Sequence, residues 1–354
     1  MSFVETSIYR VSMIGQQCKV IWSASKYNEN IMRSQMRSDN GYIWIFGATG
    51  FIGQALFRRL SANSAKPLVI LLHRHTPFEQ FEHHHTITGS LSTLDPFWLN
   101  RFPPKVIYHM ARPAGSSALT RYIAAFRGEK ANQKLASMLT ALDKPPMVVY
   151  GSGSLVYGEP SAGNMASEES PVAPVSFARY YARNENPWLQ AARNDLLDVR
   201  LARPAWIVGP GSWFKKFFWD HFIHRGMVPY YGNGTQNMSL VHIDDCARMI
   251  EQLGVSEHQV PALNIVATPP ITQLEFAERM AAILDAKVCQ VSYRITSRHY
   301  EKTTADALTT SVPIRTNYGF IYDKTQLQFK DPDAILSDII GLLKHKKGVL
   351  SEAP

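Results

Sequence analysis

Three glycines spaced three residues apart, Gly47, Gly50 and Gly53, are the feature that most limits the folds open to this chain. An apolar run, YIWIF at 42–46, leads directly into them, and the amphipathic stretch QALFRRL at 54–60 follows. Glycines in such a turn allow a tight bend, let backbone N–H groups approach a pyrophosphate, and let a helix pack closely on a strand. The motif therefore predicts a strand, a turn and a helix that together bind a dinucleotide.

The apolar runs beyond this motif predict an α/β fold. They alternate with segments of helical period, which is typical of a parallel sheet covered on both faces. We therefore expect a Rossmann-type doubly wound parallel sheet with a smaller C-terminal substrate-binding lobe. The expected strands are residues 42–46, 67–72, 105–110, 146–151 and 198–204.

Changes of sequence texture predict the domain organisation. Residues 1–40 show no clear strand or helix period, and we expect a poorly packed N-terminal extension. This segment faintly resembles an organelle transit peptide, and a true start at Met36 is the alternative. Residues 41–205 are the expected dinucleotide-binding Rossmann domain. Residues 206–354 are expected to be mainly the substrate-binding lobe, with segments near 239–267 returning to the Rossmann domain.

Two helices are expected in the lobe. One covers residues 272–285 and opens with Thr272 and Glu275, which have the spacing of a capping box before an apolar stripe. The other covers residues 333–344.

Composition and charge exclude several classes of protein. The 354 residues are 45% hydrophobic and 19% charged, as in ordinary globular domains. No apolar run approaches the roughly 18 residues needed to span a bilayer, and the N-terminus lacks the long apolar centre of a secretory signal. The net charge of +8 is scattered and accompanies no nucleic-acid-binding motif. We therefore expect a cytoplasmic protein with neither a nucleic acid nor a membrane as partner.

Cysteines and histidines do not form a metal-binding pattern. Cys18, Cys246 and Cys289 lie far apart with no C-x-x-C pair, so neither a disulfide framework nor a thiolate zinc site is expected. The histidines at 73, 75 and 83–85 have no carboxylate or cysteine that completes a ligand set. The sequence therefore predicts no metal.

The string GATGFIG at 47–53 resembles the extended short-chain dehydrogenase/reductase group, also called the NAD-dependent epimerase/dehydratase family. Residues 109–111 resemble its H-x-A-A motif, 152–158 its S-S-x-x-V-Y-G, 203–211 its R-P-x-x-x-x-G-P-G, and 241–245 its V-H-V-D-D. In order and spacing the resemblance covers about residues 42 to 345 and implies an NAD(P)-binding protein. The cofactor-binding residues that it implies are Gly47, Thr49, Gly50, Phe51, Ile52, Gly53, Arg74, Ser90, Leu91, Met110, Ala111 and Pro204.

The end of the second expected strand bears on which dinucleotide is bound. An acidic residue about 20 positions beyond the glycines would bind the ribose hydroxyls of NAD, but this chain has HRH at 73–75. The guanidinium of Arg74 suits a phosphate dianion, so the sequence favours NADP, with NAD as the alternative. The alternative interpretation of Arg74 is that it only faces solvent. The family's G-D-L, which holds the adenine, is GSL at 89–91, where Ser90 still forms hydrogen bonds, though weaker ones.

The expected catalytic residues depart from the family pattern. In the resembled family, a tyrosine and a lysine four residues later share one face of a helix, and the lysine lowers the pKa of the phenol. Here Tyr181 is followed at that spacing by Glu185, whose charge would raise the pKa of the tyrosine. The position of the family's catalytic serine or threonine is Gly153, so Ser152 and Ser154 are the neighbouring candidates.

A proline raises a second doubt about this helix. Pro187 favours a helix that begins at Pro187 with Asn186 as its N-cap, and Tyr181 would then precede the helix. If a helical turn exists there, Tyr180 and Arg183 have the i, i+3 spacing that would bring a positive charge near a phenol. The alternative is that both tyrosines simply cover a pocket wall.

The substrate signals favour a less polar molecule than a nucleotide sugar. Nucleotide-sugar members have an arginine shortly before V-H-V-D-D, where this chain has Met238. The stretch 232–245 more closely resembles reductase-like members. An apolar substrate wall, or simple core, is expected from Trp206, Trp213, Phe214, Phe217, Phe218 and Trp219.

These signals predict an NADP-dependent oxidoreductase acting on a small or apolar carbonyl or alcohol substrate. The alternative is a non-catalytic dinucleotide-binding sensor or regulatory protein, and a nucleotide-sugar epimerase is disfavoured. The expected partners are a small-molecule substrate and, at most, a second copy of the chain in a homodimer.

Overall fold

The computed structural model describes residues 41–73, 79–112, 115, 117–161, 163–321 and 327–351. The side chains of Tyr181 and of residues 346–351 are not described. The expectations for residues 1–40 and for Arg74 therefore lie outside the described residues. The chain divides into two units after Gly41, and the elements below belong to the unit that begins at Tyr42.

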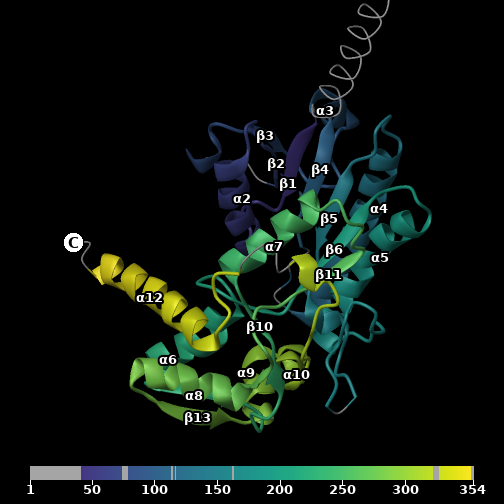
Figure 1. The fold of residues 1–354 in the computed structure, drawn as a ribbon. Coiled ribbons are helices and arrows are strands. Elements are labelled where there is room, and N and C mark those ends of the chain that lie inside the picture. The colour runs from purple at the N-terminus through teal and green to yellow at the C-terminus, as the bar shows by residue number, and fades with distance from the viewer. Residues whose placement is uncertain are drawn as a thin grey trace, which may run out of the picture. The chain divides into compact units, whose positions relative to one another are not determined.

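A seven-stranded parallel sheet forms the centre of this unit (Figure 1). Its order, β11-β6-β5-β4-β1-β2-β3, doubles back beside β1, as in a doubly wound sheet. The predicted fold class and all five predicted strands are confirmed. The two strands that the sequence did not reveal, β3 and β11, are four residues long and lie at the sheet edges. The strands are β1 (Tyr42–Phe46), β2 (Val69–Leu72), β3 (His85–Thr88), β4 (Pro104–His109), β5 (Met147–Gly151), β6 (Val199–Pro204) and β11 (Ala262–Ile265).

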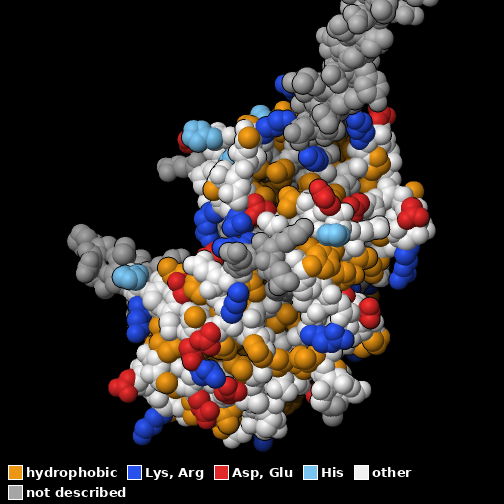
Figure 2. Space-filling view, viewed as in Figure 1, with side chains coloured by type: hydrophobic (Ala, Val, Ile, Leu, Met, Phe, Trp, Pro, Cys, Tyr) orange, Lys and Arg blue, Asp and Glu red, His pale blue; other side chains and the backbone are white. Residues whose placement is uncertain are grey.

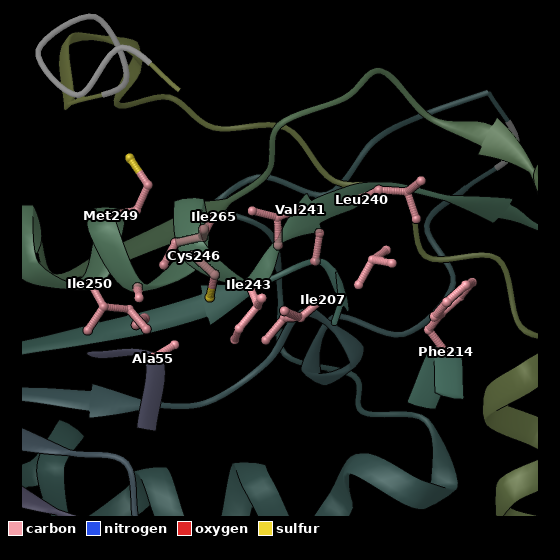
Figure 3. Close-up of a cluster of buried hydrophobic side chains, with 14 of the residues drawn as sticks. Ala55, Ile207, Phe214, Leu240, Val241, Ile243, Cys246, Met249, Ile250 and Ile265 are labelled. Carbon is pink, nitrogen blue, oxygen red and sulfur yellow. The ribbon is translucent and has the colours of Figure 1, made fainter. Parts of the chain in front are cut away.

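Helices cover both faces of the sheet because successive strand residues point to opposite sides. Ile45 packs in the hydrophobic cluster that includes Leu56 and Cys246, whereas Trp44 packs in the cluster that includes Trp188. Figure 3 shows part of the first cluster, where residues of α2, α7 and the strands meet. The helices on the first face are α2 (Phe51–Asn63) and α7 (Ile243–Val255); those on the second are α4 (Ala118–Thr140) and α5 (Arg179–Arg193), with α3 (Pro96–Arg101) at the end of the sheet.

The segments after β6, apart from α7 and β11, build a lobe next to the carboxyl ends of the strands (Figure 1). Two helices there were predicted, and both exist as α8 and α12. Thr272 caps α8 by accepting from the backbone N–H of Glu275 at 3.1 Å, but the Glu275 carboxylate bonds Arg279, so only half of the capping box forms. The elements are β7 (Trp206–Val208), η4 (Lys215–Trp219), α6 (Asp220–Arg225), β8 (Met227–Tyr231), β9 (Asn237–Met238), β10 (Leu240–His242), β12 (Ile271–Thr272), α8 (Gln273–Leu284), β13 (Lys287–Val291), α9 (Tyr293–Tyr300), α10 (Lys302–Thr309) and α12 (Pro332–Ser351).

The predicted start of the helix near Pro187 is wrong. Helix α5 begins at Arg179 and runs through Pro187, and Asn186 lies inside it rather than at its N-cap. A proline in a helix interior costs about 3 kcal/mol. Burial of Trp188 and Glu185 on either side of the proline anchors the helix to the sheet and offsets that cost. Tyr181 is therefore helical.

The surface carries charges of both signs. On the face drawn in Figure 2, Lys and Arg side chains lie among Asp and Glu side chains. No helix within the described ranges is long and apolar enough to cross a membrane.

Candidate dinucleotide and substrate site

The glycine turn is shaped by contacts between backbone atoms. Gly47 has φ +82°, and a Cβ there would lie 2.6 Å from the backbone nitrogen of Ala111. A Cβ on Gly53 would overlap the carbonyl oxygen of Gly47, to which the N–H of Gly50 donates at 2.9 Å. Gly50 is the N-cap of α2 and, as a glycine, has no side chain that could accept from the first N–H groups of the helix. These groups can therefore donate to a ligand.

A cavity of about 1110 Å³, cavity A, extends from this turn along the ends of the strands. Its walls include nine of the twelve predicted cofactor-binding residues. Of the other three, Gly53 packs behind the turn, Pro204 lies in a neighbouring cavity, and Arg74 is outside the described residues. The nine are Gly47, Thr49, Gly50, Phe51, Ile52, Ser90, Leu91, Met110 and Ala111.

Cavity A also has polar walls that the sequence did not single out. The side chains of His73, Arg112 and Arg127 line it, together with Asn132 and Asn184. None of its described lining residues is an aspartate or glutamate. A helix N-terminus, nearby cations and the absence of these carboxylates all favour an anionic group, so the described residues fit a dinucleotide.

Two asparagines and a histidine form a buried network beside this cavity. His109 Nε2 and Asn132 Oδ1 are 3.0 Å apart, and Asn132 Nδ2 donates to the backbone oxygen of Asn184 at 3.1 Å. The Asn132 bond to Asn184 fixes the orientation of its carboxamide. The atom that faces His109 is therefore Oδ1, which accepts from the imidazole Nε2–H. Burial lowers the pKa of His109 to about 4, so the imidazole is neutral at physiological pH.

A smaller cavity of about 330 Å³, cavity B, adjoins cavity A, and the two share Phe51, Ile52 and Arg112 as lining residues. Both predicted serines line cavity B, and the hydroxyl of Ser152 is buried without a hydrogen-bond partner among the described residues. Most of the remaining wall is apolar.

The predicted aromatic wall divides into two groups. Trp206, Trp213 and Phe217 line cavity B, as expected for a substrate wall. Phe214, Phe218 and Trp219 are buried in the hydrophobic core and do not appear among the described lining residues of either cavity. Phe217 also belongs to the hydrophobic core cluster, so the core interpretation holds for four of the six residues, and the substrate-wall role of the three that line cavity B stays a prediction.

Glu185, at the position of the expected lysine, forms a buried ion pair. The guanidinium of Arg203 donates to its carboxylate through Nη2 at 2.6 Å and Nε at 3.2 Å. Arg203 Nη1 also donates to the hydroxyl of Tyr157 at 3.1 Å, and that hydroxyl donates to Asn264 Oδ1 at 2.8 Å. Burial acts to lower the pKa of Arg203, but the charge and hydrogen bonds of Glu185, together with those of Tyr157, outweigh burial and raise the pKa. Glu185 is therefore paired with a cation and is not the isolated negative charge that the sequence predicted beside Tyr181.

The remaining candidates on α5 point in different directions. Tyr180 is half-buried, with its ring 5.7 Å from that of Phe177. Arg183 faces α4, where its Nε donates to Glu129 at 2.6 Å and its guanidinium lies 5.0 Å from the ring centre of Phe126. The partner of Arg183 in the structure is therefore a carboxylate on α4, and its predicted role beside Tyr180 stays a hypothesis.

A model of the NAD dependent epimerase/dehydratase family matches residues 43–264. The chain belongs to this family. Its elements in that range include the glycine turn, both serines and helix α5, so cavities A and B lie largely within the family's shared region.

Solved structures of similar fold come from nucleotide-sugar enzymes. UDP-glucuronic acid 4-epimerase from Bacillus cereus, in complex with UDP-glucuronic acid and NAD, is 18% identical, with a TM-score of 0.69 over 86% of this chain and 99% of that one. DesIV, a dTDP-glucose 4,6-dehydratase from Streptomyces venezuelae with NAD bound, is 20% identical, with a TM-score of 0.69 over 87% of this chain and 98% of that one. At these identities the likeness shows the fold.

One curated relative also matches. An uncharacterized protein of Sinorhizobium fredii, y4nG, is 30% identical over 112 residues, which are 31% of this chain and 28% of that protein. The match thus spans less than a third of the relative's length.

The sequence did not predict these polar residues of cavity A, because they leave little signal in the sequence. Asn132, Asn184 and Arg127 lie on long helices, where only the packing of α4 and α5 on the second face of the sheet brings them to cavity A. Arg112 directly follows the family's H-x-A motif, and that position was the one usable signal. Within the described residues, no group of three histidines, cysteines, aspartates or glutamates lies close enough to hold a metal ion.

Proposed function

We propose that the protein is an NADP-dependent oxidoreductase that acts on a small or apolar carbonyl or alcohol substrate. The observation that carries the proposal is cavity B, a mostly apolar space that adjoins the dinucleotide-sized cavity A and has two serines in its wall. A bound nicotinamide would supply or accept the hydride. The chain's own residues bind and orient the reactants.

The preference for NADP rests on charge. Arg74 follows the second strand, and the described walls of cavity A hold arginines and a histidine but neither aspartate nor glutamate. A 2′-phosphate would meet attraction there, since the repulsive carboxylate of NAD-specific sites is missing. NAD, which the similar solved structures contain, is the alternative cofactor.

The size and lining of cavity B support an apolar substrate. Its volume of about 330 Å³ lies at the low end of ligand pockets, and Arg112 is the one charged side chain among its described lining residues. A diphosphate and a sugar would leave many polar groups unpaired against this wall. Met238, at the position of the arginine of nucleotide-sugar members, is buried in β9. A nucleotide sugar, the substrate class of the similar solved structures, is therefore disfavoured.

Ser152 is the residue that we assign to the substrate oxygen. Its buried hydroxyl has no hydrogen-bond partner among the described residues, and Ser152 lines cavity B, whereas Ser154 begins the short helix η2 (Ser154–Val156) in the same wall. A hydrogen bond to a carbonyl that gains negative charge during reduction would stabilise the transition state.

Titration with NADPH and NADH, followed by hydride transfer to a panel of neutral carbonyl compounds, tests the proposal. We expect tighter binding of NADPH, turnover of an apolar carbonyl compound, and a loss of about a hundredfold in kcat on Ser152→Ala, with a smaller loss on Ser154→Ala. Failure of both dinucleotides to bind, or turnover of nucleotide sugars alone, would refute it.

The second candidate is a non-catalytic sensor that binds the dinucleotide without turnover. The buried Glu185–Arg203 pair favours it, because the position of the family's lysine is filled by a closed structural ion pair. Binding of NADPH with no hydride transfer across the panel would select this function.

A further inference from the structure

Arg121, near the start of α4, joins two elements that border cavity B. Its Nη2 donates to the carboxylate of Glu301 at 2.6 Å and to the hydroxyl of Thr303 at 2.7 Å. Its guanidinium also lies 5.1 Å from the ring centre of Phe177, within the range of a cation–π contact. The Arg121 side chain is 11% exposed, so these contacts are largely shielded from water. Arg121 and these three partners are called the clamp below.

The partners of Arg121 belong to the wall of cavity B or adjoin it. Phe177, in the short helix η3 (Ser176–Ala178), is one of the lining residues. The other two partners stand at the start of α10, whose Thr304 also lines the cavity. The clamp therefore fixes the first turn of α10 relative to the ring of Phe177.

Glu301 is strained in the conformation that the clamp requires. Its φ of +79° and ψ of 155° fall in a region that favours glycine over a residue with a side chain. Its carboxylate accepts from Arg121 and also from the backbone N–H of Ala118, the first residue of α4, at 3.3 Å. These contacts tie the strained link between α9 and α10 to a helix that covers the sheet. Strain that persists beside a cavity indicates a functional constraint.

A second tie acts further along α10. The hydroxyl of Ser176 donates to the carboxylate of Asp306 at 2.7 Å, and the hydroxyl of Tyr293 donates to its other oxygen at 2.6 Å. Asp306 lies one helical turn beyond Thr303 and is held without Arg121. Release of the clamp would therefore free the first turn of α10, while the rest of the helix stays in place.

We propose that the clamp limits the size of the substrate, and that Arg121 determines specificity by acting through Phe177 and Thr304. With the first turn of α10 held, cavity B has a volume of about 330 Å³, at the low end of ligand pockets. With that turn released, the cavity can widen and admit longer apolar molecules. The inference deepens the proposed function, on whose apolar substrate it rests, but it does not require turnover.

Binding of neutral ketones of rising chain length tests the clamp. Dissociation constants of methyl n-alkyl ketones are measured by calorimetric titration of the protein saturated with NADP⁺, or with NAD⁺ if the parent prefers it. The parent should bind them more tightly with each added methylene up to a limiting length, and more weakly beyond it. Two variants open the clamp. Arg121→Met removes the charge but keeps an apolar chain beside Phe177, and Glu301→Gly removes the carboxylate and suits the positive φ.

Both variants should raise the limiting length. We expect them to bind ketones beyond the parent's limit about tenfold more tightly than the parent does, within the effect of one charge-assisted hydrogen bond, and to bind shorter ketones with little change. The double variant should gain nothing over the better single variant, because both substitutions open the same clamp.

Arg279→Met is the matched control. The guanidinium of Arg279 also bonds carboxylates, those of Glu275 and Asp333, but Arg279 is not among the described lining residues of cavity A or cavity B. This variant should leave every dissociation constant unchanged.

Amide hydrogen exchange separates the clamp from the proposed substrate. The N–H of Ala305 donates to the backbone oxygen of Glu301 at 3.0 Å, and without ketone it should exchange about tenfold faster in both variants than in the parent. Unchanged exchange, an unchanged limiting length, or an equal loss of affinity for all ketones would overturn the inference. Faster exchange in a protein that binds no ketone would support the clamp and refute the apolar substrate of the proposed function.

Discussion

The glycine turn at 47–53 and helix α5 both border the site, but they are specified in different ways. The turn is fixed by backbone contacts, since Gly47 has a positive φ and an added Cβ on Gly53 would strike the Gly47 carbonyl. Helix α5 is fixed by side-chain pairs that reach distant segments, Glu185 to Arg203 and Arg183 to Glu129. The backbone part of the site follows from the spacing of the glycines, whereas the side-chain part depends on which charged residues meet across the fold.

The largest expected effect tests the side-chain part. Glu185→Lys restores the family residue but places a second cation against buried Arg203. Breaking a buried pair in this way costs about 3–5 kcal/mol, so we expect that loss in the free energy of unfolding, measured by urea denaturation. The double variant Glu185→Met with Arg203→Met should keep most of the parent's stability, because no buried charge remains unpaired. A Glu185→Lys protein as stable as the parent would mean that the pair does not form.

A substitution in the glycine turn tests the backbone part of the site. Gly47→Ala forces a side chain into a positive φ and against the backbone of Ala111, at a cost of roughly 3 kcal/mol. We expect lower thermal stability together with loss of dinucleotide binding, measured by calorimetric titration. Gly163→Ala is the matched control: Gly163 also has a positive φ, +78°, but an added Cβ meets no atom of the described residues within 4 Å. It should cost stability without affecting binding, and equal loss of binding in both variants would contradict the role of the turn.

Cofactor choice is expected to depend on a single side chain. A charge-assisted contact between Arg74 and a 2′-phosphate contributes about 1.5–3 kcal/mol, roughly tenfold to a hundredfold in affinity. Arg74→Ala should therefore remove most of the preference for NADPH over NADH, with NADH affinity as the internal control. The assignment is wrong if the variant keeps the parent's preference.

The smallest effect is expected at Tyr181. Without a lysine, the tyrosine and lysine proton relay of the family should not operate, so Tyr181→Phe should lower turnover less than about tenfold. General acid–base catalysis supplies up to about 10⁴-fold, and a thousandfold loss confined to this variant would show that the relay is active. Tyr180→Phe, measured on the same carbonyl substrate, shows whether the neighbouring phenol acts instead.

The two parts of the site also differ in how well the sequence predicted them. The family motifs located nine lining residues of cavity A, and five of them lie in the glycine turn, where backbone geometry depends on which residues lack a Cβ. The start of α5 was predicted wrongly, because the local preference of Pro187 is weaker than the burial of Trp188 and Glu185 against the sheet. The roles of Asn132 and Asn184 had no local signal, since each depends on contacts between α4 and α5.

By itself, the sequence determined the family, the parallel sheet and the glycine turn, because periodicity and missing side chains act over a few neighbouring residues. Only the tertiary structure decided which charges meet. Arg203 on β6 lies 18 residues from Glu185, and only the packing of α5 on the sheet brings the two buried side chains together. Among the described residues, the same packing leaves the buried oxygen of Asn184 without a hydrogen-bond partner. Such pairings depend on three-dimensional proximity and desolvation, which residue spacing does not encode.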